Sequence, residues 1–374
     1  MKRLTIITMQ LHTPGGIERF ISTLATMLSN DFEVEIIANY GRTKDTLAFP
    51  LPSNLKLTFL TPDQPEEISM KYLITHFKLH RIPSEIIRRL TITKNQKQAF
   101  KAYLSRLDTD YIITDRANYN NLISRYYHGH AIKIATDHNF HQNNPKYINE
   151  LIKSLKGFNY LIVATEELKN FYKNKIKPTK CLAIPNPLIS IPTQKSMLKS
   201  KNLLSIGRLC PEKDFSTLIA AMQIVHRQDP DIHLAIIGDG NERQALQNQI
   251  SSLHLTNSIT LTGWLPQNKI AKYYYDSSLF VMTSKTEAFG LVLTEAMSYG
   301  LPCLALSRAS GARAQITKDT GLLINTENPT IIASHVLNLI HHPAVLKSYQ
   351  LNISKTIRNY SLDSVKQSWL QILQ

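Results

Sequence analysis

Two carboxylates, Glu287 and Glu295, stand eight positions apart around a Phe289-Gly290 pair. The apolar run before them reads as a strand, and the residues from Gly290 onward read as a helix. At the start of that helix the backbone N–H groups of Phe289, Gly290 and Leu291 lack intrahelical partners, so they can bind an anion such as a phosphate. Both glutamates can face the same position. The spacing alone also fits an ordinary strand-to-helix junction with two solvated glutamates.

Two cations, Arg208 and Lys213, follow an earlier apolar run and precede another helical pattern. A guanidinium can bind a phosphate through two hydrogen bonds and an ammonium adds a compact charge, so the pair suits a diphosphate. The same residues could also be two surface cations. Further on, Gly238 and Gly240 connect a predicted strand to a helix. They favour either a ligand close to the backbone or close packing alone.

In the first half of the chain, Gly15 and Gly16 precede an amphipathic helical pattern, without the full glycine fingerprint of a dinucleotide site. They could form a tight turn and nothing more. Asp115, Asp137 and His138 follow two further predicted strands, at the strand ends where open α/β sheets bind ligands. The carboxylates could bind hydroxyl groups of a ligand. The histidine could bind a ligand hydroxyl or a developing charge, although a single histidine is more often only a polar residue.

Apolar runs alternate with amphipathic helical patterns along all 374 residues, which predicts an α/β protein with two parallel-sheet domains. The predicted division is an N-terminal domain over 1–190, a proline-rich linker over 191–201, a second domain over 202–355 and a last helix over 356–374. No apolar run reaches the roughly 18–20 residues of a membrane-spanning helix. The short apolar run at the start predicts a buried strand, not a signal peptide.

The net charge of +15 is concentrated in residues 68–106, where nine Lys and Arg face Glu85 alone. Helices are predicted over 68–80, 84–90 and 94–107, with Pro83 ending the first. Nucleic acid, an anionic membrane and an anionic substrate are candidate partners. Two alternatives remain for this segment, namely solvated surface helices or docking on anionic lipid. Nucleic acid is disfavoured because no binding module is recognisable.

Three cysteines, Cys181, Cys210 and Cys303, are widely spaced and form neither a metal-ligand pattern nor an even disulfide set. We expect them to be reduced in the cytoplasm. The sequence therefore predicts no structural metal.

Four elements in order resemble the retaining glycosyltransferases of family four, also called glycosyl transferases group 1. They are Gly15-Gly16, Gly-Arg-Leu-x-x-x-Lys at 207–213, Gly238-x-Gly240 and Glu287-x7-Glu295 with Phe289-Gly290 inside it. The resemblance spans nearly the whole chain and is strongest over 202–324. It implies the GT-B fold, an α/β architecture of two Rossmann-like domains facing each other across a cleft. It also implies that the last helix packs back on the first domain.

The resemblance assigns expected roles. Arg208 and Lys213 bind the donor phosphates, Glu287 the donor sugar and Glu295 the ribose hydroxyls, while His138 lies near the donor sugar. The implied catalytic residues are His138, Glu287, Arg208 and Lys213, and the implied donor-binding residues are Gly15, Gly16, Gly238, Gly240, Phe289, Gly290, Leu291 and Glu295. Asp115 and Asp137 are the candidate acceptor-binding residues.

The expected activity is a retaining, metal-independent transfer of a sugar from a nucleotide-diphosphate sugar, UDP-linked, to a saccharide. The acceptor would be a lipid-linked saccharide or glycolipid of bacterial envelope or capsule synthesis. No cofactor beyond the donor is expected. The protein would be cytoplasmic, and peripheral on the inner face of the cell membrane if 68–106 docks there. Two alternatives are a GT-B nucleotide-sugar epimerase, which needs no acceptor, and a non-catalytic GT-B partner subunit.

Overall fold

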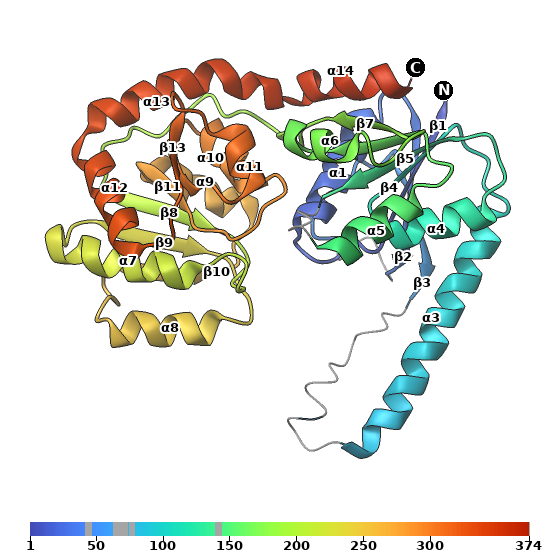
Figure 1. Cartoon of the computed structure of the whole chain (residues 1–374), viewed down its shortest axis with the longest axis horizontal. Coiled ribbons are helices and arrows are strands. Elements are labelled where there is room, and N and C mark those ends of the chain that lie inside the picture. Colours follow the sequence, from blue (N-terminus) through green and yellow to red (C-terminus); the bar gives the residue numbers. More distant parts are fainter. Residues whose placement is uncertain (42–46, 63–73, 75–78, 139–143, 374) are drawn as a thin grey trace. The chain divides into compact units, whose positions relative to one another are not determined.

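The computed structural model covers the whole chain and describes every residue except 42–46, 63–73, 75–78, 139–143 and 374. The chain divides into two compact units (Figure 1). The N-terminal unit comprises Met1–Val163, Leu168–Ala183 and Trp369–Gln374, and the C-terminal unit comprises Ala164–Glu167 and Ile184–Ser368. Each unit is built on its own parallel sheet, which gives the two Rossmann-like domains that were predicted.

The sheet of the N-terminal unit has seven parallel strands in the order β3-β2-β1-β4-β5-β6-β7. The strands are β1 (Arg3–Thr8), β2 (Glu33–Tyr40), β3 (Lys56–Thr61), β4 (Tyr111–Thr114), β5 (Ile132–Asp137), β6 (Tyr160–Val163) and β7 (Lys180–Ala183). Strand β4 is buried throughout and β1 after its first residue, as expected for a parallel sheet covered on both faces. The strand order reverses between β1 and β4, so the ligand-binding switch point of this unit lies at their carboxyl ends.

Helices connect these strands and cover the sheet (Figure 1). They are α1 (Gly16–Leu28), the 3₁₀ helix η2 (Leu79–Arg81), α3 (Ile82–Leu104), α4 (Ala117–Tyr126), α5 (Pro145–Ser154) and α6 (Glu166–Tyr172). In α1 the buried side chains of Phe20, Ile21, Leu24 and Leu28 recur at helical spacing, so one face packs in the core.

Helix α3 corrects one sequence prediction. It is one continuous helix of 23 residues, not separate helices over 84–90 and 94–107. Pro83 lies in its first turn, where the missing N–H removes no intrahelical hydrogen bond, so the proline begins a helix and does not end one. The helix predicted over 68–80 lies almost entirely outside the described residues.

The sheet of the C-terminal unit has six parallel strands in the order β10-β9-β8-β11-β12-β13. The strands are β8 (Asn202–Ile206), β9 (His233–Ile237), β10 (Ile259–Gly263), β11 (Leu279–Met282), β12 (Cys303–Leu306) and β13 (Gly321–Ile324). The helices are α7 (Phe215–Gln228), α8 (Arg243–Ser252), α9 (Gln267–Asp276), α10 (Leu291–Ser298), α11 (Ser310–Gln315), α12 (Pro329–His341), α13 (Pro343–Thr356) and the 3₁₀ helix η3 (Ile357–Tyr360). The order reverses between β8 and β11, which places the second switch point at their carboxyl ends.

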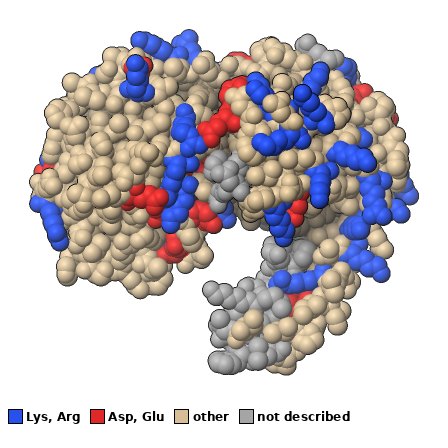
Figure 2. Space-filling view, in the orientation of Figure 1, with Lys and Arg blue, Asp and Glu red and all other residues tan. Residues whose placement is uncertain are grey.

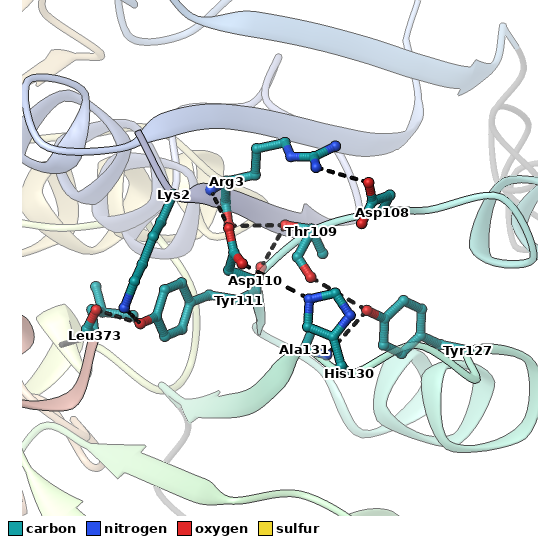
Figure 3. Close-up of polar contacts among 10 residues, drawn as sticks. All are labelled: Lys2, Arg3, Asp108, Thr109, Asp110, Tyr111, Tyr127, His130, Ala131 and Leu373. Atoms are coloured by element: carbon teal, nitrogen blue, oxygen red, sulfur yellow. Dashed lines mark hydrogen bonds and ion pairs between the residues drawn. The ribbon is translucent and has the colours of Figure 1, made fainter.

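The last helix, α14 (Leu362–Leu373), ends in the N-terminal unit. Trp369 is fully buried there, with its ring 6.5 Å from that of Phe20. The hydroxyl of Tyr111 donates a hydrogen bond of 2.5 Å to the carbonyl of Leu373 and accepts one of 3.0 Å from Lys2 Nζ (Figure 3). These contacts join the chain end to the amino ends of β1 and β4. The switch point lies at the opposite, carboxyl ends of the same two strands.

Among the described residues, no helix combines the length and the apolar character that a membrane crossing requires. The three cysteines form no disulfide. Cys181 and Cys303 are buried and Cys210 is half-buried.

Candidate active site

The switch point of the C-terminal unit brings two loops together. Lys213, in the loop after β8, forms an ion pair with Glu287, in the loop after β11. The hydroxyl of Ser284 lies 3.4 Å from the same carboxylate oxygen of Glu287. Backbone contacts fix the two loops as well, since the N–H of Lys285 donates to the carbonyl of Glu212 at 2.7 Å. An ammonium and a carboxylate that are 74 residues apart in sequence therefore meet beside β8 and β11.

Helix α10 begins at this position. Gly290 precedes its first residue with a φ of +82°, in the left-handed region that favours glycine. The carbonyl of Phe289 accepts a 2.5 Å hydrogen bond from the side-chain amide of Gln315. The backbone of Gly311 lies against the same carbonyl, because a Cβ there would come within 2.0 Å of Phe289 O. The turn that precedes the N–H groups of α10 is thus held by two contacts from α11.

Neither glutamate is solvated, which contradicts the alternative of an ordinary junction with two solvated glutamates. Glu295 is 5% exposed and accepts a 3.1 Å hydrogen bond from the hydroxyl of Tyr274, a fully buried side chain of α9. The side chain of Glu287 is 15% exposed and is paired with Lys213. Burying a carboxylate is costly unless it is hydrogen-bonded or paired. The partners Tyr274 and Lys213 therefore make a carboxylate favourable at both positions.

The glycines after β9 serve close backbone packing. A Cβ at Gly238, where φ is +143°, would lie 1.9 Å from the carbonyl oxygen of Gly207, and one at Gly240 would lie 2.3 Å from that of Leu209. Packing alone therefore requires both glycines, whether or not a ligand also approaches them. Arg208 lies in the loop after β8, which also carries Lys213, and its side chain is exposed.

The switch point of the N-terminal unit carries a second polar cluster. Gly15 caps α1 with extended backbone, and a Cβ there would lie 2.2 Å from a carboxylate oxygen of Glu18. Glu18 is 7% exposed and accepts a 2.5 Å hydrogen bond from Gln10 Nε2. No atom lies within 4 Å of a Cβ built on Gly16. Close contact with Glu18 therefore accounts for a glycine at position 15, whereas packing does not require a glycine at position 16.

The two aspartates of this unit have different surroundings. Asp115, 2% exposed at the end of β4, accepts a 2.8 Å hydrogen bond from Thr8 Oγ1. Burial raises its pKa to about 6, although nearby Arg116 and the Thr8 hydrogen bond act in the opposite direction. Asp137, 3% exposed at the end of β5, accepts a 2.5 Å hydrogen bond from the hydroxyl of Tyr147.

His138 is half-buried just beyond β5. Its Nε2 lies 3.0 Å from Thr136 Oγ1, and its ring lies 4.1 Å from that of Phe20. Burial, and then the positive charge of Arg116, lower its pKa to about 4. The imidazole is therefore neutral at pH 7 and can accept or donate a single hydrogen bond without carrying charge.

Each unit thus gathers part of the residue set that the sequence singled out. Lys213, Glu287, Gly290 and Glu295 converge in the C-terminal unit, with Arg208 on the same loop as Lys213. In the N-terminal unit, Asp115 follows β4 at the switch point, and Asp137 and His138 follow the neighbouring strand. Several supporting residues were missed by the sequence analysis, among them Gln10, Tyr274 and Gln315. Nothing in their spacing marks them. The partners of Tyr274 and Gln315 are distant in sequence, whereas Gln10 binds Glu18 in the neighbouring turn, eight residues on.

No cluster of three or more His, Cys, Asp or Glu side chains suited to a metal ion occurs in the described part of the chain.

Comparisons with known proteins give the family context. Residues 191–359 match the model of the family described as glycosyl transferases group 1. The chain is 25% identical over 390 residues to the amylovoran biosynthesis glycosyltransferase AmsD of Erwinia amylovora, and the alignment covers all of both chains. It is 26% identical over 383 residues to the N-acetylgalactosamine-N,N'-diacetylbacillosaminyl-diphospho-undecaprenol 4-alpha-N-acetylgalactosaminyltransferase of Campylobacter jejuni, covering 98% of this chain and 97% of that one.

Among solved structures, S. aureus TarM in complex with fondaparinux, alpha-GlcNAc-glycerol and UDP matches with a TM-score of 0.81 and 17% identity over 99% of each chain. This similarity shows the GT-B fold. The family model and the full-length relatives together support a group 1 glycosyltransferase.

Proposed function

We propose that this protein is a retaining glycosyltransferase that moves a sugar from a nucleotide-diphosphate sugar, UDP-linked, to a lipid-linked saccharide or glycolipid. The observation that carries the proposal is the Lys213–Glu287 pair beside the start of α10. It places a cation, a carboxylate and a helix N-terminus at one switch point, which are the groups that a diphosphate and a sugar hydroxyl require.

The leaving group is the nucleoside diphosphate, which gains negative charge as its bond to the sugar breaks. Arg208, Lys213 and the N–H groups at the start of α10 are placed to stabilise that charge. Glu287 would accept a hydroxyl of the donor sugar and Glu295 the ribose hydroxyls. Phe289, Gly290 and Leu291 supply the backbone of the phosphate site, and Gly238 and Gly240 shape the adjacent loop.

The proposed reaction exchanges one bond at the anomeric carbon. The bond to the diphosphate oxygen breaks while the acceptor oxygen attacks the same face, and the departing phosphate takes the acceptor proton. No carboxylate attacks the sugar in this scheme, so the two glutamates are not the acid and nucleophile of a hydrolase. The scheme also requires no metal ion.

The acceptor is proposed to lie against the switch point of the N-terminal unit. Asp115 and Asp137 would bind its hydroxyl groups. Gly15 and Gly16 would lie near the donor phosphate or the acceptor. Neutral His138 would lie near the donor sugar. The name of the Campylobacter jejuni relative specifies a saccharide on diphospho-undecaprenol, which supports a lipid-linked acceptor here. The protein would then act in the cytoplasm on a membrane surface, without nucleic acid.

The test is sugar transfer from UDP-sugars to an undecaprenyl-diphosphate-linked saccharide, with the anomeric configuration of the product read by NMR. We expect an α-linked product from an α-linked donor, and a loss of transfer of at least about 100-fold in Glu287→Gln. A β-linked product would refute retention. Conversion of the donor without any acceptor would identify an epimerase. If neither the wild type nor Glu287→Gln transferred sugar and both still functioned in cells, the protein would be a partner subunit.

A further inference from the structure

A pocket of about 340 Å³ lies at the carboxyl ends of β12 and β13, and β13 is the edge strand of its sheet. The last residues of these strands, Leu306 and Ile324, are buried and line the pocket together with Arg308 and residues 325–328. Most of the residues 325–328 are exposed, so the pocket is open to solvent on that side. Its volume is in the range of small-molecule sites. None of the lining residues belongs to the proposed donor site.

Arg308 supplies the positive charge of the pocket. Its Nη2 donates a hydrogen bond of 3.2 Å to Asp214 Oδ2, and its Nη1 forms an ion pair with Glu327. Its Nε is buried and has no hydrogen-bond partner among the residues that the structure describes. A buried donor without a partner is costly. The guanidinium therefore has capacity for a further acceptor beyond the two carboxylates.

The two carboxylates on Arg308 differ in how firmly they are held. Asp214 is 8% exposed, and a second cation, Lys285 Nζ, lies 3.7 Å from its Oδ1. The side chain of Glu327 is 51% exposed, and in the described part of the chain its only ion pair is with Arg308. An exposed ion pair contributes little to stability. Glu327 can therefore leave the guanidinium at low cost, whereas Asp214 cannot.

The charges that remain select the kind of anion. Without Glu327, the cations Arg308 and Lys285 face Asp214 alone, which gives a local net charge of +1. One carboxylate on a ligand balances this charge. A phosphate monoester carries about −1.5 to −2 at pH 7, so it would leave excess negative charge beside Asp214.

A broad basic surface is not what attracts an anion to this unit. The visible face of the C-terminal unit is mostly uncharged, and acidic side chains lie beside several of its basic ones (Figure 2). An anion is therefore expected to bind the unit at particular places.

The polar groups on the open side of the pocket are mainly hydrogen-bond donors. Asn325 Oδ1 accepts from Ser307 Oγ at 3.2 Å, and Asn328 Oδ1 accepts from the N–H of Thr330 at 2.9 Å. Both amide oxygens are thus engaged, which leaves the NH₂ groups to donate to a ligand. The hydroxyl of Thr326 accepts from the N–H of Asn328 at 3.1 Å and can donate as well. Such donors suit the oxygens of a sugar, and the two apolar strand-end residues suit its C–H groups.

We propose that this pocket is a second ligand site, separate from the donor site, and that it binds a sugar acid through its carboxylate. The ligand carboxylate takes the place of Glu327 on Arg308, because a guanidinium binds carboxylates with good geometry. The exposed carboxylate of Glu327 occupies that place in the absence of ligand. The alternative is that the Arg308–Glu327 pair only joins the loops after β12 and β13.

The test is titration of the full-length protein with three sugars that differ at C6, followed by ligand-observed NMR. They are D-glucuronate, D-glucose and glucose 6-phosphate, which carry a carboxylate, a neutral hydroxyl and a phosphate. We expect D-glucuronate to bind and D-glucose to bind at least about tenfold more weakly, because it lacks the charged hydrogen bond. Glucose 6-phosphate should also bind more weakly than D-glucuronate. Tighter binding of either competitor would overturn the carboxylate assignment.

Glu327→Gln gives the most specific result, because the proposal predicts a gain. Removing the competing carboxylate should tighten D-glucuronate binding by about two- to fivefold. The matched control is Asp319→Asn, which removes an exposed acid of the same unit outside the pocket and should leave the affinity unchanged. Equal D-glucuronate affinities in Glu327→Gln and Asp319→Asn would overturn the proposal. So would the absence of D-glucuronate binding in both the wild type and Glu327→Gln.

Arg308→Lys tests the guanidinium itself. This variant keeps the charge but loses the planar group, so D-glucuronate should bind about tenfold more weakly. Unchanged affinity in a folded Arg308→Lys protein would overturn the role of Arg308. If this variant does not fold, Glu327→Gln still decides the question.

Saturating UDP separates the pocket from the donor site. D-glucuronate should bind with the same affinity with and without UDP, whereas loss of binding would place it in the donor site and overturn the proposal. Methyl β-D-glucuronide distinguishes two sources of the same ligand chemistry. Binding equal to that of the free acid would assign the pocket to an acidic residue within a saccharide, and binding of the free acid alone would assign it to a free sugar acid.

Discussion

Two glycines with nearly the same positive φ give a matched pair for testing the phosphate site. Gly290 precedes α10 with a φ of +82°, and Gly157 lies in a turn of the N-terminal unit with a φ of +80°. A Cβ at Gly290 would meet nothing closer than Leu293 Cδ1 at 3.4 Å, and one at Gly157 would meet nothing within 4 Å. Neither alanine variant creates a steric clash. The only structural cost that they share is the left-handed backbone.

That cost predicts similar losses of stability. An L-residue in the left-handed region costs about 1–2 kcal/mol relative to glycine. For a unit of this size, each kcal/mol lowers the melting temperature by about 2–4 °C. We therefore expect Gly290→Ala and Gly157→Ala to lower the melting temperature by comparable amounts in the absence of ligand.

The two variants should differ in binding UDP. The alanine methyl group of Gly290→Ala would lie beside the backbone N–H groups proposed to bind the diphosphate. We expect the methyl group to push the diphosphate away from one of these N–H groups, so that one hydrogen bond is lost. A hydrogen bond to a charged group contributes about 1.5–3 kcal/mol, and each 1.4 kcal/mol is a factor of about ten in affinity. Isothermal titration calorimetry should show affinity weaker by about 10- to 100-fold in Gly290→Ala and unchanged in Gly157→Ala. Equal affinities in the two variants, with equal losses of stability, would refute the phosphate site at α10.

Three further predictions concern substitutions at other positions. Tyr274→Phe removes the hydroxyl that donates to Glu295, so calorimetry should show UDP affinity reduced about tenfold. The neighbouring control, Tyr275→Phe, should leave UDP affinity unchanged. Equal affinities in the two variants would contradict the role of Glu295. The pKa of Asp115 is raised to about 6, so the unfolded state loses this proton first and the carboxyl group lowers stability as pH rises from about 4 to 6. Asp115→Asn should therefore gain stability relative to the wild type between pH 4 and pH 7 in urea unfolding; a constant difference would show an unperturbed carboxyl group. Gly16→Ala should raise stability by about 0.4–1 kcal/mol, because alanine reduces the conformational freedom of the unfolded chain. Gly238→Ala should lower stability sharply because its Cβ would lie 1.9 Å from Gly207 O; thermal unfolding in the opposite order would refute the packing argument.

Much of the architecture could be predicted from the sequence because it depends on local patterns. Apolar runs followed by helical patterns indicated two parallel sheets. Polar residues that follow the predicted strands indicated that ligands bind at the carboxyl ends of those strands. Strand order is a long-range property, so the alternation alone did not show which loops would be neighbours. The reversals between β1 and β4 and between β8 and β11 determine that Lys213 meets Glu287 and that Thr8 binds Asp115.

The supporting residues were beyond the reach of sequence reasoning for the same reason. Tyr274 lies in a tyrosine-rich helix, and nothing in its spacing shows that its hydroxyl reaches Glu295. Gln315 holds the carbonyl of Phe289 from another helix. Pro83 was misassigned because a proline can either end a helix or occupy its first turn, and the residues around it fit both.

The central claim is that a nucleoside diphosphate binds at the switch point of the C-terminal unit. The most direct measurement is calorimetric titration of UDP, GDP and ADP into the wild type, Arg208→Ala and Arg227→Ala. Both arginines have exposed side chains in the same unit, and Arg227 lies in the last turn of α7. We predict that UDP binds the wild type and Arg227→Ala equally and binds Arg208→Ala at least about tenfold more weakly. Binding of no nucleotide by the wild type, or equal UDP binding by all three proteins, would contradict the claim.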